Sequence, residues 1–321
     1  MKYILITCDT EIGELGQNVE NAFEIFIEGK VENQEVGVKL INDIASKYNA
    51  TVEHFVDVYP FEKIGENKFK NLCLSILDSG HKIGLHTHPS VLLKKRFMWQ
   101  YSLQEQIEIV RLGKEKIKEW TGISVISHRA GGYGADDNTL LALKVNNILI
   151  DSSFFYSNPN CKIKYPYKNK VDFYKGIYEI PVTVYEKYFQ FLFFKKKYYQ
   201  KLDFRYGSST EEIIQVIKNL PDNSVAIIFL HSFNFLNLPY DFKKKKYGKI
   251  SVNYHLIKSF DNLLASLSKI NDVVFTTSEY LYRNKLITND LILSLKVKIF
   301  PFFIKKLKSK IENFLGYRGN I

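Results

Sequence analysis

Short apolar runs alternate along the chain with longer stretches in which apolar residues recur every three or four positions. The short runs are typical of buried strands and the longer stretches of amphipathic helices. Strands are predicted at 3–8, 51–58, 82–86, 124–128, 148–152, 177–184, 225–230 and 273–276. Helices are predicted at 36–48, 67–79, 103–121, 137–145, 209–219 and 252–270. Such repetition favours an α/β fold with a parallel sheet, either a wound sheet or a parallel (β/α)7–8 barrel.

The pattern divides the chain into one barrel domain at 1–290 and a basic amphipathic helix or tail at 291–321. Seven basic residues and one acid lie between 296 and 321, more than half of the net charge of +11. A basic amphipathic helix can lie on an anionic membrane surface. It can equally dock its apolar side on the domain and leave its lysines in solvent, and the sequence leaves both open.

Composition narrows the class of protein. Apolar residues make up 45% of the 321 residues and charged residues 25%, which excludes intrinsic disorder as the main description. Three scattered cysteines do not form a disulfide framework. The apolar run at the start is too short for a secretory signal, so we expect a cytoplasmic protein. The positive charge follows no nucleic-acid motif, and no nucleic-acid partner is expected.

One segment interrupts the alternation. Residues 185–205 are rich in aromatic side chains and carry six basic residues. A run of charge is usually a solvated loop, whereas aromatics beside lysines can also grip a sugar polymer, a lipid or a nucleic acid. The sequence does not choose among these roles.

Reactive side chains gather at the ends of the predicted strands. The carboxyl ends of barrel strands converge on one face of the molecule, where catalytic residues collect. This set of strand-end residues is Asp9, Glu11, His86, His88, His128, Arg129, Asp151 and His231.

Two imidazoles and a carboxylate are common protein ligands of a hydrolytic metal ion. His86 and His88 are two residues apart, so an extended backbone points both the same way. With one of the strand-end carboxylates they form the candidate site for a divalent metal, and we expect zinc. A bound metal, a carboxylate base and a histidine acid suit hydrolysis of an amide or ester. His128 directly precedes Arg129, and neighbouring side chains in a strand point to opposite faces. We therefore expect a structural role for His128.

At this point the sequence resembles the polysaccharide deacetylases of carbohydrate esterase family 4, the NodB-like enzymes. Residues 7–11 (TCDTE) resemble the first motif of that family, TFDDG. The resemblance makes Asp9 the catalytic base. Thr10 stands in place of the metal-binding second Asp, and Glu11 is the nearest residue that could bind the metal instead.

The second motif, H[ST]xxH, resembles residues 86–90 (HTHPS). His86 matches the first histidine of the motif. Ser90 stands where the second histidine is expected, and His88 can take that role from a shifted position.

Three further motifs follow in the family's order. Residues 129–133 (RAGGY) resemble the third motif, in which Arg129 would orient the base and the backbone N–H at Tyr133 would be the oxyanion donor. Asp151 fits the Asp that tunes the acid, and His231 fits the general acid of the last motif.

The resemblance covers nearly the whole chain before the basic tail, and it implies a distorted parallel (β/α)7–8 barrel. It implies a metal-dependent hydrolase that removes an N-acetyl or related N-acyl group from a saccharide during surface polysaccharide biosynthesis. The saccharide could be lipid-linked or nucleotide-linked, with peripheral membrane contact through the basic helix. The alternative is a non-catalytic anion- or membrane-surface-binding protein on a decayed barrel, motivated by Thr10 and Ser90.

Overall fold

The structure is a computed structural model that describes residues 1–13, 16–191, 194–241 and 246–296; for 189–191 and 194–195 only the backbone is described. Most of the basic helix predicted for 291–321 therefore lies outside the described residues. Among the residues described, no helix combines the length and the apolar character needed to cross a bilayer.

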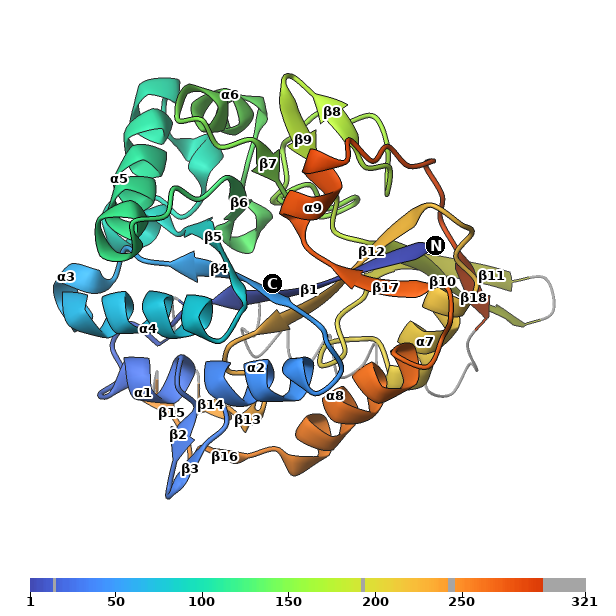
Figure 1. The fold of residues 1–321 in the computed structure, drawn as a ribbon, viewed down its shortest axis with the longest axis horizontal. Helices are drawn as coiled ribbons and strands as arrows, with labels where there is room; N and C mark the ends of the chain where they lie inside the picture. Colours follow the sequence, from blue (N-terminus) through green and yellow to red (C-terminus); the bar gives the residue numbers. More distant parts are fainter. Residues whose placement is uncertain (14–15, 192–193, 242–245, 297–321) are drawn as a thin grey trace.

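A curved, mostly parallel sheet forms the centre of the molecule (Figure 1). Its strands are β1 (Lys2–Thr10), β4 (Val52–Asp57), β5 (Lys82–Thr87), β6 (Ser127–Ala130), β7 (Ile150–Asp151), β8 (Asp172–Tyr174), β9 (Ile177–Glu179), β12 (Ser224–His231) and β17 (Val273–Thr276). They follow the order β12-β1-β4-β5-β6-β7-β9-β8, and β17 pairs with the first half of β1. Only β8 runs antiparallel to its neighbour in this sheet. The predicted distorted parallel (β/α) barrel is confirmed.

The helices lie around the outside of the sheet (Figure 1). They are α1 (Ala22–Phe26), α2 (Val38–Ser46), α3 (Phe61–Ile64), α4 (Glu66–Asp78), α5 (Leu103–Thr121), α6 (Asp137–Val145), α7 (Thr210–Lys218), α8 (Tyr254–Leu267) and α9 (Ser278–Arg283), with 3-10 turns η1 (Pro89–Val91), η2 (Met98–Gln100) and η3 (Gly131–Tyr133). The predicted helices 103–121 and 137–145 are reproduced residue for residue. Each begins at a capping side chain, Ser102 or Asp136, that accepts a backbone N–H of the first turn.

The barrel is closed by irregular backbone between β9 and β12. The strand predicted for 177–184 ends at Glu179, and the backbone beyond it still reaches the edge of β12. The N–H of Ile227 donates to Oγ1 of Thr183 at 2.8 Å, and the N–H of Phe229 donates to the carbonyl of Leu202 at 3.0 Å. This irregular closure is what distorts the barrel.

The aromatic and basic segment 185–205 is mainly a hairpin beside the barrel. Strands β10 (Val184–Phe191) and β11 (Phe194–Lys201) pair antiparallel, and β18 (Ser294–Lys296) runs parallel to β10. Residues 294–296 of the predicted tail are thus the third strand of this small sheet. The other pairs are β2 (Lys30–Val31) with β3 (Gln34–Glu35), β13 (Leu236–Asn237) with β16 (Ser251–Val252), and β14 (Tyr240–Asp241) with β15 (Lys246–Tyr247).

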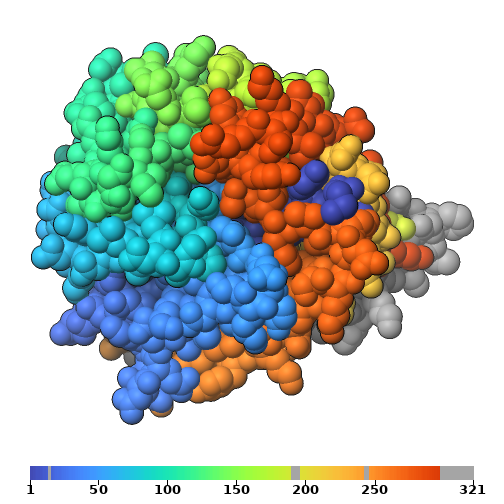
Figure 2. Space-filling view, in the orientation of Figure 1, coloured from blue at the N-terminus to red at the C-terminus, as the bar shows by residue number. Residues whose placement is uncertain are grey.

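The amino end of β1 reaches the surface among residues of the C-terminal third of the chain (Figure 2). Along β1 the chain then passes through the core, where Ile4, Ile6 and Cys8 are buried. Its carboxyl end, at Asp9 and Thr10, lies next to the ends of β12 and β4. The candidate site is built at this second end.

Candidate active site

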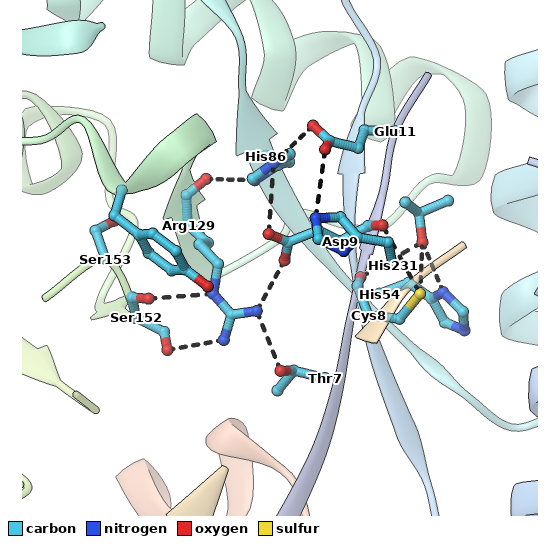
Figure 3. A network of polar contacts seen from close by, with 12 residues as sticks. Thr7, Cys8, Asp9, Glu11, His54, His86, Arg129, Ser152, Ser153 and His231 are labelled. Carbon is cyan, nitrogen blue, oxygen red and sulfur yellow. Dashed lines mark hydrogen bonds and ion pairs between the residues drawn. The ribbon is translucent and has the colours of Figure 1, made fainter. Parts of the chain in front are cut away.

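Glu11, His86 and His88 form a compact, buried cluster. One possible ligand atom of each lies within 4.8 Å of the others. Nε2 of His86 lies 3.4 Å from Oε2 of Glu11, and Nε2 of His88 contacts the same oxygen. His86 lies near the end of β5 and His88 directly follows that strand, while Glu11 directly follows β1. Figure 3 shows His86 and Glu11 facing each other. The structure therefore brings the three predicted metal ligands together.

The donor set fits a divalent cation such as zinc, for which two imidazoles and one carboxylate are usual ligands. Nδ1 of His86 lies 2.8 Å from the carbonyl oxygen of Arg129, which can only accept a hydrogen bond. Nδ1 therefore carries a proton, which leaves Nε2, the nitrogen on the side of Glu11, as the atom that would bind a metal. Burial alone raises the pKa of Glu11, but the nearby imidazoles of His88 and His86 outweigh it and hold that pKa well below its ordinary value.

Asp9 lies beside this cluster but is held by a different partner. Its Oδ1 accepts a hydrogen bond from Nη1 of Arg129 at 2.8 Å, while its Oδ2 lies 3.7 Å from Nε2 of His86 (Figure 3). The fully buried Arg129 guanidinium also donates to Oγ1 of Thr7 and to Ser152, and it lies over the ring of Phe55. Asp9 is thus a carboxylate fixed by a buried cation, pointing one oxygen toward the candidate metal site.

His231 completes the opposite side of the cluster. It ends β12, directly opposite Asp9 in the strand register, and its Nε2 lies 3.7 Å from Oε1 of Glu11. The imidazole stacks on Phe233 and meets the edge of Phe229. Burial lowers the pKa of His231 to about 4, so the imidazole is neutral at neutral pH.

The glycine-rich turn η3 packs against the cluster. A Cβ on Gly131 would lie 2.4 Å from Nε2 of His88, so only glycine lets the backbone pass this close. Gly132 and Tyr133 follow with φ of 56° and 60°, in the left-handed region. The turn therefore runs from the strand that holds Arg129, past the imidazole of His88, to Tyr133.

Asp151, predicted to tune the acid, pairs with His128 in the neighbouring strand. Its Oδ1 lies 2.7 Å from Nδ1 of His128 and accepts a hydrogen bond from Ser153. No contact joins Asp151 to His231 among the described residues. The strand order explains this pairing, because β7 lies beside β6, which carries His128, while β12 lies elsewhere in the sheet. His128 accordingly has the structural role expected of it.

The two residues that depart from the family motifs also find other surroundings. The hydroxyl of Thr10 contacts Nδ1 of His54 at 2.8 Å and lies near the carbonyl of Cys8. Ser90 lies in the turn η1, outside the cluster of candidate ligands. The candidate metal ligands grouped with His86 are therefore Glu11 and His88.

Three charged residues near the site were not predicted from the sequence. Asp57 ends β4 opposite His86 in the register, and burial raises its pKa to about 6. It follows the same strand-end rule as Asp9, so that rule could have found it. Lys201 and Asp203 are buried near His231, and the charge of each shifts the pKa of His231. Nothing in the aromatic and basic segment distinguishes them beforehand.

No family model matches the sequence, and a search of curated proteins finds no match either. Among solved structures, one from Mycobacterium smegmatis, assigned as a polysaccharide deacetylase, matches at a TM-score of 0.55 and 15% identity, over 92% of this chain and 95% of that chain. A family 4 carbohydrate esterase from Streptomyces lividans matches at 0.47 and 9% identity, over 91% and 97%. A peptidoglycan deacetylase from Bacillus subtilis matches at 0.43 and 11%, over 96% of each chain.

The first of these matches shows a shared fold across nearly the whole chain. The protein thus has the barrel seen in that Mycobacterium smegmatis structure, as the sequence motifs had implied. At this identity the likeness concerns the fold, and the chemistry must be argued from the residues in the site.

Proposed function

We propose that this chain is a divergent member of carbohydrate esterase family 4, a metal-dependent hydrolase that removes an N-acetyl or related N-acyl group from a saccharide. The observation that carries the proposal is the grouping of Glu11, His86 and His88 beside the Asp9–Arg129 pair. Five motifs that are each imperfect in the sequence supply residues to one end of one barrel.

A divalent cation held by Glu11, His86 and His88 would act as a Lewis acid toward the acyl oxygen and water. Asp9 has the geometry of a base, because Arg129 fixes one of its oxygens and the other faces the cluster. The backbone N–H of Tyr133 would stabilise negative charge on the acyl oxygen.

His231 would protonate the leaving amine. Its pKa of about 4 makes the resting imidazole neutral, so it must take up a proton before it donates one. Asp9 and His231 occupy paired positions on β1 and β12, which places the residue that gains the water's proton beside the residue that needs one.

The direct test is acetate release from a panel of N-acetylated oligosaccharides by the metal-loaded protein. Asp9→Asn and His231→Ala should lower kcat by at least about 100-fold. His255→Ala removes an exposed imidazole and should leave kcat unchanged. Full activity in Asp9→Asn would overturn the role of Asp9 as the base. If acetate were released from none of the substrates, the proposed deacetylase function would be overturned.

The natural substrate is proposed to be an intermediate of surface polysaccharide assembly, lipid-linked or nucleotide-linked, met near an anionic membrane surface. The support is charge, since seven basic residues lie between 296 and 321. Flotation with phosphatidylglycerol vesicles should be strong for the full chain and lost after deletion of 297–321. Unchanged flotation would remove the membrane from the proposal.

A non-catalytic protein on the same fold is the competing function, motivated by Thr10 and Ser90 at the expected ligand positions. The grouping of Glu11 and His88 with His86 argues against it. Equilibrium dialysis with Zn²⁺ separates the two, because a decayed site should not retain a stoichiometric cation.

A further inference from the structure

The aromatic and basic segment sends one lysine into the barrel. Lys196 and Lys197 of strand β11 are exposed, whereas Lys201, at the end of the same strand, is 4% exposed. The next residue, Leu202, accepts the N–H of Phe229 and so joins this backbone to the edge of β12. Lys201 therefore stands in the irregular closure of the barrel, beside the strand that ends at His231.

The ammonium of Lys201 has three neighbours, all next to the candidate site. Nζ lies 3.2 Å from the hydroxyl of Tyr133, 3.2 Å from Oδ2 of Asp203 and 3.7 Å from the centre of the Phe229 ring. Phe229 in turn packs nearly perpendicular to the His231 imidazole, with ring centres 4.8 Å apart. The lysine thus touches the turn that bears Tyr133 and the aromatic floor beneath the proposed acid.

Stability alone does not explain a charge in this place. Desolvating an ammonium costs several kcal/mol, and apolar residues of similar volume often replace a buried ion pair without loss of stability. Burial lowers the pKa of Lys201, but Tyr133 and Asp203 outweigh that effect and the pKa is raised overall. The side chain remains charged, and its N–H donates to the Tyr133 hydroxyl.

Tyr133 is a residue that needs to be held. Its φ of 60° is uncommon for a bulky side chain, and such a conformation persists only where the surrounding structure holds it. Its phenol is buried, which raises the pKa to about 12 and keeps the hydroxyl protonated at neutral pH. At the other end of the same short turn, Gly131 packs on the imidazole of His88. A fixed phenol therefore fixes the turn relative to the cluster.

We propose that Lys201 is a positioning residue of the site, which holds η3 through the Tyr133 hydroxyl so that the Tyr133 backbone N–H faces the reacting acyl oxygen. Asp203 supplies the counter-charge that lets the ammonium stay buried beside it. The role assigned to the backbone N–H rests on the proposed function. The placement of Tyr133 by Lys201 does not, and it can be tested separately.

A double-mutant cycle on the metal-loaded protein tests the kinetic part. Lys201→Met and Tyr133→Phe should each lower kcat by about 10-fold or more with KM nearly unchanged, because both release the same turn. The double variant should lose no more than the worse single variant. If the fold losses in kcat of the two single variants multiplied in the double variant, or if only KM changed, the proposal would be overturned.

Lys187→Met is the matched control. Lys187 is another buried lysine of the same hairpin, ion-paired with Glu212 of α7 at 2.7 Å. Its replacement should leave kcat unchanged in the folded fraction, which thermal unfolding measures. An equal loss of kcat in Lys187→Met would show a general effect of removing buried charge and would overturn the assignment.

An NMR experiment tests the placement of Tyr133 by Lys201 independently of the proposed hydrolase function. In protein labelled with ¹⁵N-tyrosine, the Tyr133 amide resonance is identified by its loss in Tyr133→Phe. It should move in Lys201→Met and stay in place in Lys187→Met, whether or not the chain releases acetate. An unmoved Tyr133 resonance in folded Lys201→Met would overturn the positioning role. Should Lys201→Met not fold, Tyr133→Phe, which loses only the hydroxyl, carries the kinetic test.

Discussion

Nδ1 of His86 lies 2.8 Å from the backbone carbonyl oxygen of Arg129, so strand β6 fixes the tautomer of a proposed metal ligand. The side chain of the same Arg129 binds Asp9, the proposed base. One residue thus orients two of the groups that the reaction needs. Because one of these contacts uses the backbone, substitutions at Arg129 should act mainly on Asp9.

The two carboxylates at the end of β1 should differ in their effect on metal binding. Glu11→Gln removes a candidate ligand and should weaken Zn²⁺ binding by more than about 100-fold. Asp9→Asn alters a side chain held by Arg129 and should leave Zn²⁺ bound. Metal content after dialysis, measured by plasma emission, checks both. Equal Zn²⁺ content in both variants would exclude Glu11 as a ligand.

Arg129→Met should destabilise the fold by about 3–5 kcal/mol, because it leaves the buried Asp9 carboxylate without its cation. Adding Asp9→Asn should recover part of this loss, since the uncompensated charge is then gone. Urea unfolding of the metal-free proteins measures both free energies. If the double variant were less stable than Arg129→Met by the full cost of Asp9→Asn, the ion pair would not be the cause.

Asp57→Asn should stabilise the metal-free protein at pH 8. Burial raises the Asp57 pKa from its ordinary 3.8 to about 6, so the folded state binds more protons between these values. Stability is then lost as pH rises from about 4 to 6, by on the order of 3 kcal/mol. The asparagine variant escapes this loss, so its advantage should be present at pH 8 and absent at pH 4.

Urea unfolding at both pH values in the presence of a chelator measures the effect. Asp78→Asn, at an exposed position on α4, is the matched control and should show no such difference. The same stability change at pH 4 and pH 8 would contradict the buried, protonated state of Asp57.

His54 should make the fold sensitive to acid. Burial lowers its pKa from 6.5 to about 3, so the unfolded chain binds a proton that the folded protein does not. Above pH 6.5 the wild type should be more stable than His54→Gln. As the pH falls below 6.5, this difference in unfolding free energy should shrink by about 1.4 kcal/mol per pH unit. Urea unfolding between pH 7.5 and 4.5 checks this. His255→Gln, at an exposed position, should keep a constant difference from wild type.

The sequence by itself determined the alternation of strands and helices, because periodic burial is a local signal. It placed α5 and α6 at their observed ends, since Ser102 and Asp136 cap the first turns. It also placed Asp9, Glu11, His86, Arg129 and His231 at strand ends that converge in any parallel barrel. These inferences need only the chain's own period and polarity.

Only the tertiary structure decided which side chains meet. Asp151 pairs with His128 because β7 lies beside β6, and neither partner choice nor strand order is written in a local pattern. Lys201 is buried while Lys196 and Lys197 of the same strand are exposed, because the backbone turns at Leu202 to close the barrel. The sequence shows that each of these lysines is charged. Whether the ammonium is solvated or contacts a buried phenol depends on long-range packing.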